Sequence, residues 1–334
     1  MANIRGGGAI LPELILYATL RYLAGGSYSD IKYFTGISRG SLYRVIWKCM
    51  KAIIKCKELD IKFPQTVEEV KRAARGFESI STQGCIWNCV SVADGYHLQT
   101  QTPSKKEDKN VRSFFSGHYQ CYGVNVQAAC DHHCRFTFLG VAAPGVTGDR
   151  DAIDLVALGS LVKNLPGLYC VIVDCAYTAT EKLVPIFRGD MARISRNDVF
   201  NFYASQLRIR IEMAFGLMVQ KWGILSRPLR IKIRKVKKLI IAVARLHNYC
   251  INRRLLTEKR KLKKKGRRGR AVFTPRDATL TAHESMLREN AAYFEWDEMH
   301  DGCEEGWSRN RDRMVKEIEY LKLTRPGVKG DNRR

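Results

Sequence analysis

The sequence predicts an α/β fold, in which a mixed sheet is flanked by helices and preceded by a small helical module. Three strand-like runs come first, at residues 85–93, 119–130 and 135–143. Residues 168–173 then form a continuous apolar run, which is typical of a strand buried on both faces. That run lies between two helix-patterned stretches, residues 151–164 and 206–222. Strands followed by a buried strand between helices indicate a layered α/β domain.

Residues 1–60 are predicted to form the helical module. Ser27 and Ser38 are suitable helix N-caps, and Gly36 lies between them at a turn. This order gives a helix-turn-helix-like outline, in which Arg39 and Arg44 occupy exposed positions of the second helix and would meet DNA. The alternative is a three-helix packing module with a solvated basic face, and the sequence leaves both open.

Three further segments follow the module. Residues 61–257 are expected to form the main domain, which ends with a helix over residues 236–256. Residues 258–275 form a basic linker, and nine of the twelve residues in 259–270 are Lys or Arg. That run is interpreted as a nuclear import signal, a DNA-contacting tail or a solvated linker. Residues 276–334 are an appended tail whose role the sequence does not indicate.

Positive charge is concentrated in one part of the chain. The net charge is +24, and residues 205–270 contain 22 Lys or Arg against two acidic residues, which gives +20 for that segment. A positive field of this strength favours polyanions, of which DNA is the expected partner. Besides Arg39 and Arg44, the predicted DNA-binding side chains of this segment are Arg208, Arg210, Lys232, Arg234, Lys235, Lys237 and Lys238.

The eleven cysteines do not form the pattern of a disulfide scaffold in a chain of this length, so we expect reduced thiols. A zinc site formed by Cys85 and Cys89 with Cys130 and Cys134 is an alternative. Their spacing departs from the usual two-residue gap, which favours small buried side chains instead. No apolar run approaches the length of a membrane span, so no membrane partner is expected.

Four acidic residues are the candidate site. Asp94 and Asp174 each end an apolar, β-branched run, Asp149 follows a Pro- and Gly-containing turn, and Glu212 lies in the helix-patterned stretch. Carboxylates that converge from strand ends and a packed helix repel one another unless a cation neutralises them, and their hard oxygen atoms select Mg²⁺ or Mn²⁺. Such a site suits phosphodiester chemistry with two metal ions. Asp149 has an alternative role as the cap of the following helix.

Two arginines closely precede Glu212 in the sequence. Arg208 and Arg210 would hold the scissile phosphate as charge-assisted donors, or would be ordinary ion-paired helix arginines. His247 lies among apolar neighbours of the last helix and is interpreted as a hydrogen-bonded core histidine.

Several separate motifs resemble one known family. They are Ala93-Asp-Gly-Tyr-His97, Asn125-Val-Gln-Ala-Ala-Cys-Asp131, Ala143-Pro-Gly145, Ile211-Glu-Met-Ala-Phe-Gly216 and Leu246-His-Asn248. In order and spacing they resemble the DDE endonuclease domain of PIF/Harbinger transposases, over roughly residues 60–257. The family often has His at the position of Gly148, Gly at Val173 and Ser at Cys175. None of these differences removes a carboxylate.

The resemblance implies an RNase H-like core in which Asp94, Asp174 and Glu212 match the catalytic acids and Asp149 matches a further metal-site position. It implies a divalent-metal-dependent DNA endonuclease, with Mg²⁺ or Mn²⁺ as cofactor and strand transfer as a further activity. It also suggests a separate Myb-like DNA-binding partner, a homo-oligomer and a nuclear location. The rival hypothesis is a domesticated, non-catalytic DNA-binding protein that retains the fold.

Overall fold

The computed structural model describes residues 9–266 and 308–326 of the chain. The chain divides into two compact units, one of residues 1–249 with 308–334 and one of residues 250–307. In the second unit, the described residues continue helix α8 (Ile233–Gly266). The predicted basic linker and tail therefore lie partly outside the described residues. No helix in the described parts of the chain is long and apolar enough to cross a membrane.

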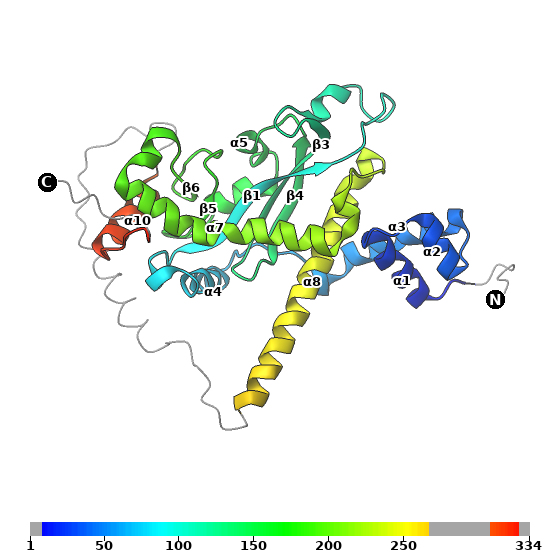
Figure 1. Ribbon diagram of the computed structural model, residues 1–334, viewed down its shortest axis with the longest axis horizontal. Helices are drawn as coiled ribbons and strands as arrows, with labels where there is room; N and C mark the ends of the chain where they lie inside the picture. The colour runs from blue at the N-terminus through cyan, green and yellow to red at the C-terminus, as the bar shows by residue number, and fades with distance from the viewer. Residues whose placement is uncertain (1–8, 267–307, 327–334) are drawn as a thin grey trace. The chain divides into compact units, whose positions relative to one another are not determined.

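The first unit is built on a curled mixed sheet, so the predicted α/β fold with a mixed sheet and flanking helices is confirmed (Figure 1). Its strands are β1 (Cys89–Gln99), β2 (Phe115–Ser116), β3 (Cys121–Cys130), β4 (Phe136–Pro144), β5 (Cys170–Val173) and β6 (Leu183–Pro185). The order is β2-β3-β1-β5-β6, and β4 also pairs with β3. Pairs β1–β3 and β3–β4 are antiparallel, whereas β1–β5 and β5–β6 are parallel.

Helices cover both faces of this sheet. Val171 and Val173 of β5 belong to the core cluster that α4 (Val67–Glu78) and α6 (Ala157–Lys163) complete. Because strand side chains alternate, Ile172 points to the opposite face. Helix α7 (Ser195–Lys221) contacts β1, β3 and β5 and passes in front of the strands in Figure 1. All four residues of β5 are buried, as its apolar run predicts.

Element bounds differ from the sequence expectations where long-range pairing decides them. Strand β1, expected to end near Asp94, continues to Gln99, because residues 95–99 still pair with β3. The helix predicted over residues 151–164 consists of α5 (Asp149–Ala152) and the separate α6. Helix α7 begins at Ser195, well before the predicted residue 206. Helix α8 continues beyond the predicted residue 256, since Lys, Arg and Leu favour helix.

The N-terminal module consists of α1 (Pro12–Leu23), α2 (Tyr28–Thr35) and α3 (Arg39–Lys55). Ser27 and Ser38 cap α2 and α3, and Gly36 adopts the left-handed conformation between them, with φ of 67°. The helices share a buried core that includes Leu23 and Leu42. This module packs on the start of α8, as described below.

A helix from the predicted tail also belongs to the first unit. Helix α10 (Arg309–Tyr320) contacts α7 and β6 and buries Met314 and Ile318. The Asn310 side chain donates to the carbonyl oxygens of Leu168 (2.8 Å) and Glu181 (3.0 Å). This segment therefore satisfies backbone groups beside β5 and β6 while it adds apolar core.

Candidate active site

Two of the predicted acids occupy neighbouring positions, Asp94 within β1 and Asp174 directly after β5. In the parallel pairing of β1 with β5, Val92 is opposite Ile172. Asp94 and Asp174 each follow two residues later, so strand register alone places their backbones next to each other. The Asp94 carboxylate accepts a hydrogen bond from the backbone N–H of Gly95 at 2.8 Å.

Asp149 reaches the same place from the opposite side of β1. Its Oδ1 atom accepts hydrogen bonds from Asn125 Nδ2 (2.8 Å) and Gln127 Nε2 (2.9 Å), both on β3. A Cβ atom at Gly95 would lie 1.8 Å from this oxygen, so the carboxylate fits only because residue 95 is glycine. The side chain makes no cap hydrogen bond to α5, whose N-cap is Gly148. The Asp149 side chain therefore does not cap α5 and is held by β3 instead.

Glu212 is linked to the group through an arginine. Arg208 lies one turn earlier on α7, and its Nη1 atom lies 2.6 Å from Glu212 Oε1 and 3.9 Å from Asp94 Oδ2. The Glu212 side chain is 48% exposed, whereas Asp94 is 20% exposed. Arg208 is thus held between two of the predicted catalytic carboxylates.

Burial shapes the electrostatics of this centre. It raises the pKa of Asp94 to about 7, and the negative charges of Asp149 and Asp174 add to the rise. The Gly95 N–H and the Arg208 guanidinium act in the opposite direction. Burial and the same carboxylates also raise the pKa of Tyr177 well above its usual value. Three carboxylates therefore interact in a partly desolvated space where their charges are poorly compensated.

The donor chemistry of this group fits a hard divalent cation, because carboxylate oxygens are the ligands that Mg²⁺ and Mn²⁺ prefer and a cation would relieve the repulsion seen at Asp94. The side-chain positions are less complete. Among the described residues, no three His, Cys, Asp or Glu side chains are placed so that they would hold one metal ion. The carboxylates have the right chemistry for the ion and lie near one another, but their side chains would have to change rotamer to bind it together.

Sequence reasoning assigned no role to the polar residues that hold Asp149. Asn125 and Gln127 are buried on β3, and Gln127 accepts a hydrogen bond from the Tyr177 hydroxyl at 2.8 Å. The sequence does contain an indication of this role, because two amides two residues apart in an otherwise apolar strand lie on the same face. A buried polar face of this kind requires partners, and Asp149 and Tyr177 are those partners.

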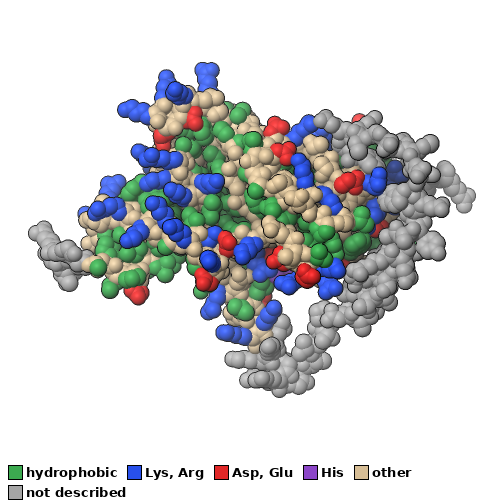
Figure 2. All heavy atoms as spheres, turned by 180° about the vertical axis from the view of Figure 1, so that it is seen from behind, with side chains coloured by type: hydrophobic (Ala, Val, Ile, Leu, Met, Phe, Trp, Pro, Cys, Tyr) green, Lys and Arg blue, Asp and Glu red, His purple; other side chains and the backbone are tan. Residues whose placement is uncertain are grey.

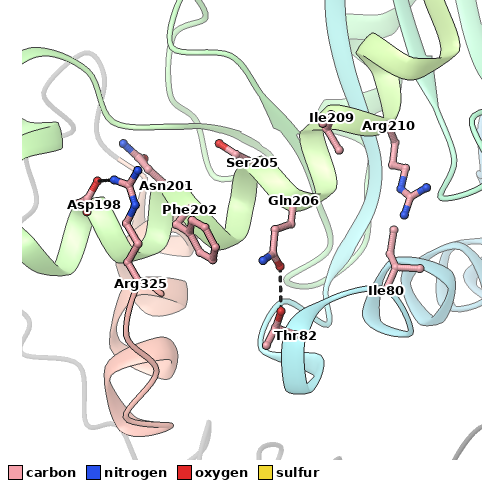
Figure 3. A pocket seen from close by; sticks show the side chains of 10 residues that line it. All are labelled: Ile80, Thr82, Asp198, Asn201, Phe202, Ser205, Gln206, Ile209, Arg210 and Arg325. Carbon is pink, nitrogen blue, oxygen red and sulfur yellow. Dashed lines mark hydrogen bonds and ion pairs between the residues drawn. The ribbon is translucent and has the colours of Figure 1, made fainter. Parts of the chain in front are cut away.

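Arg208 and Arg210 lie on different flanks of α7, since residues two apart on a helix do not share a face. Arg208 faces the acids. Arg210 lines an open groove with Ile80, Phe202 and Gln206, in which Gln206 accepts a hydrogen bond from Thr82 at 2.9 Å (Figure 3). The structure therefore brings only one of these two arginines to the acidic group.

The other predicted DNA-binding residues lie apart from the acids. Arg39 and Arg44 are exposed on α3. Lys232, Arg234, Lys237 and Lys238 are exposed at the start of α8. Lys235 differs, because its Nζ atom lies over the rings of Tyr43 (4.2 Å) and Trp47 (4.4 Å) and helps to dock the N-terminal module.

Two motif residues near the end of the first unit have structural contacts. His247 is buried, and its Nε2 atom lies 2.9 Å from the carbonyl oxygen of Cys134. Asn248 pairs with both backbone groups of Phe136, at 2.8 Å and 2.7 Å, as a neighbouring strand would. Cys85, Cys89, Cys130 and Cys134 are buried, and none of these four forms a disulfide.

Comparison with known proteins adds one finding to this geometry. Residues 93–248 match the family described as DDE superfamily endonuclease. This segment is similar to a DDE endonuclease domain. It begins one residue before Asp94, includes Asp149, Asp174 and Glu212, and ends at Asn248. Neither the curated proteins nor the solved structures give a match to the chain.

Proposed function

We propose that this chain is a divalent-metal-dependent DNA endonuclease of the PIF/Harbinger transposase type. The observation that carries the proposal is the convergence of Asp94, Asp149 and Asp174 from β1, α5 and the end of β5, within a segment similar to DDE superfamily endonucleases. The order and directions of β4, β3, β1, β5 and β6 support an RNase H-like core. The order of α2, turn and α3 supports a helix-turn-helix-like module.

The chain's own residues would then have distinct tasks. Asp94, Asp174 and Glu212 would hold Mg²⁺ or Mn²⁺, with Asp149 in the surrounding shell. The chemistry that such ions supply is activation of the attacking water and stabilisation of the leaving oxygen. Asn125 and Gln127 fix the Asp149 carboxylate. Arg208 would leave its carboxylate partners and donate to the scissile phosphate, because a metal ion would neutralise the carboxylates and the phosphate would take their place as the anion beside the guanidinium.

The rival function is a non-catalytic DNA-binding protein that kept this fold. The contact of Arg208 with both Glu212 and Asp94 is the observation that favours it, since an arginine there neutralises the acids without a metal. Single-turnover incubation of the purified chain with duplex DNA in Mg²⁺ or Mn²⁺ separates the two functions. We expect strand cleavage that chelation abolishes. Binding without cleavage in either metal would refute the nuclease and support the rival.

We also propose a nuclear location, a Myb-like DNA-binding partner and self-association, as the family resemblance implies. The basic run at residues 259–270 is the sequence feature behind the location, although residues 267–270 lie outside the described part. A reporter fused to residues 257–271 should enter the nucleus. A reporter that stays in the cytoplasm would assign import to the partner. Sedimentation of the purified chain tests self-association.

A further inference from the structure

The connection between β1 and β3, residues 100–119, is here called the arm. It is anchored at its first end to the segment that leads into α8. Thr100 forms a β-bridge with Leu229, and the backbone N–H of Gln101 donates to the carbonyl oxygen of Leu229 at 3.1 Å. Glu107 Oε1 accepts from the backbone N–H of Ile233, the first residue of α8, at 3.2 Å. A carboxylate at this position is favoured by the free N–H groups and the positive end of the helix dipole.

The other end of the arm lies beside the acidic group. The backbone N–H of Val146, close in sequence to Asp149, donates to the carbonyl oxygen of Ser113 at 2.9 Å. The Tyr119 ring stacks on His97 of β1, with centroids 4.8 Å apart. Burial raises the pKa of Tyr119, and the charges of Asp149 and Asp94 add to the rise, which places its hydroxyl within their field. The arm therefore runs from the start of α8 to the acids.

The arm presents uncompensated positive charge to solvent. Lys105, Lys106, Lys109 and Arg112 are all exposed. Its two acids are occupied by local contacts: Glu107 with Ile233 and Ser104, and Asp108 with the backbone N–H of Asn110 at 2.8 Å. Within the described parts of the chain, none of the four basic side chains has a hydrogen-bond or ion-pair partner. Figure 2 shows Lys and Arg side chains gathered on the side that carries the arm and the N-terminal helices.

We propose that the arm is a DNA-binding element whose lysines contact backbone phosphates between the start of α8 and the acidic group. Exposed Lys232 and Arg234 would extend this track at the anchored end of the arm. Duplex DNA fits because its phosphates form a long regular polyanion, whereas the two half-buried acids of the arm are held by contacts within the protein. That the polyanion is DNA rests on the proposed function.

The test compares two triple variants of the full chain. In the first, Lys105, Lys106 and Lys109 are changed to Gln. In the matched control, Lys71, Arg72 and Arg75 of α4 are changed to Gln, which removes the same charge from exposed positions on the other side of the unit in Figure 1. Affinity for a random-sequence duplex is measured against salt concentration without divalent metal. Thermal unfolding of both variants verifies that they fold.

The arm variant should flatten the slope of log affinity against log salt by about 2.7, or about 0.9 for each phosphate that is no longer neutralised. The control should flatten it by less than about 0.9, because only long-range attraction is reduced. Equal decreases in both variants, an unchanged slope in the arm variant, or no binding by the wild type would overturn the proposal. Cleavage of the same duplex in Mg²⁺ is scored separately. Arm-dependent binding without cleavage refutes the nuclease alone, and cleavage with an unchanged slope refutes the arm alone.

Discussion

The acidic group and the cations of the arm and the α8 start differ in how far their charges are buried. Asp94 and Asp149 are partly buried, interact with each other and are held by neighbouring polar groups. The cations of the arm and, apart from Lys235, those at the start of α8 are exposed and have no hydrogen-bond or ion-pair partner among the described residues. Where charges are buried together, each one depends on its neighbours, so a single change should have a large and specific effect. Where charges are exposed, their effects should be small, similar for each residue and screened by salt.

The largest expected effect tests the acidic group directly. Asp174→Asn preserves shape but removes a negative charge, and should reduce cleavage by about 1000-fold, the upper range for loss of one electrostatic stabiliser. Metal-free DNA affinity should stay the same or rise, because one repulsive charge is removed. Single-turnover cleavage and salt-dependent binding measure the two effects. Asp154→Asn, which removes an exposed acid of the same unit, is the charge control. Retained cleavage in Asp174→Asn would remove this residue from the site.

A second variant tests whether close packing, rather than charge, positions Asp149. In Gly95→Ala the added methyl group would occupy the place of Asp149 Oδ1 and displace the carboxylate. A displacement of about 1 Å should reduce cleavage by about 100-fold.

Gly148→Ala is the matched control, since nothing lies within 4 Å of the added atom and the backbone there is extended. Wild-type cleavage by Gly95→Ala, measured under the same conditions, would show that Asp149 need not approach β1.

His132, a partly buried histidine outside the acidic group, tests whether burial of a charge lowers the stability of the fold. The His132 ring packs against Gly76 of α4, and burial lowers its pKa to about 4, with neighbouring His133 adding to the effect. Below about pH 6.5 the unfolded chain binds a proton that the folded chain excludes. Stability should therefore fall as the pH is lowered from about 6.5 to about 4, by an amount on the order of 2 kcal/mol after allowance for partial exposure.

Urea unfolding between pH 7.5 and pH 4.5 measures this decrease. His132→Leu should lose less stability over that interval than the wild type. His118→Gln, which changes an exposed histidine, should follow the wild type. The same pH dependence in all three proteins would mean that other groups cause it.

The smallest expected effect concerns the one basic residue of the α8 start that departs from its neighbours. Lys235 lies over Tyr43 and Trp47 of α3, so Lys235→Gln should destabilise the protein by about 1 kcal/mol because it removes these cation–π interactions. Lys238→Gln, an exposed neighbour on the same helix, should leave stability unchanged. Denaturation followed by tryptophan fluorescence measures both. Equal stabilities would show that Lys235 does not dock α3 and behaves like the exposed cations beside it.

Local signals in the sequence were sufficient for several elements. Helix α3 begins directly after Ser38, as that predicted N-cap requires, and its apolar residues recur at helical spacing. Strand β5 is buried along its whole length, as its continuous apolar run indicates. The four acids stand in recognisable local contexts, and the segment similar to DDE superfamily endonucleases includes all of them. Each of these properties depends on residues that are close together in the chain.

Other properties were decided only by contacts between distant residues. Strand β1 continues past Asp94 because β3 pairs with it, and Asp149 reaches the acids because Asn125 and Gln127 bind it across Gly95. The tail supplies α10 to a sheet formed more than a hundred residues earlier. The sequence alone determined which side chains carry charge and which segments favour helix or strand. The tertiary structure decided which charges meet, because strand register and helix packing are set by burial of apolar faces that local sequence does not specify.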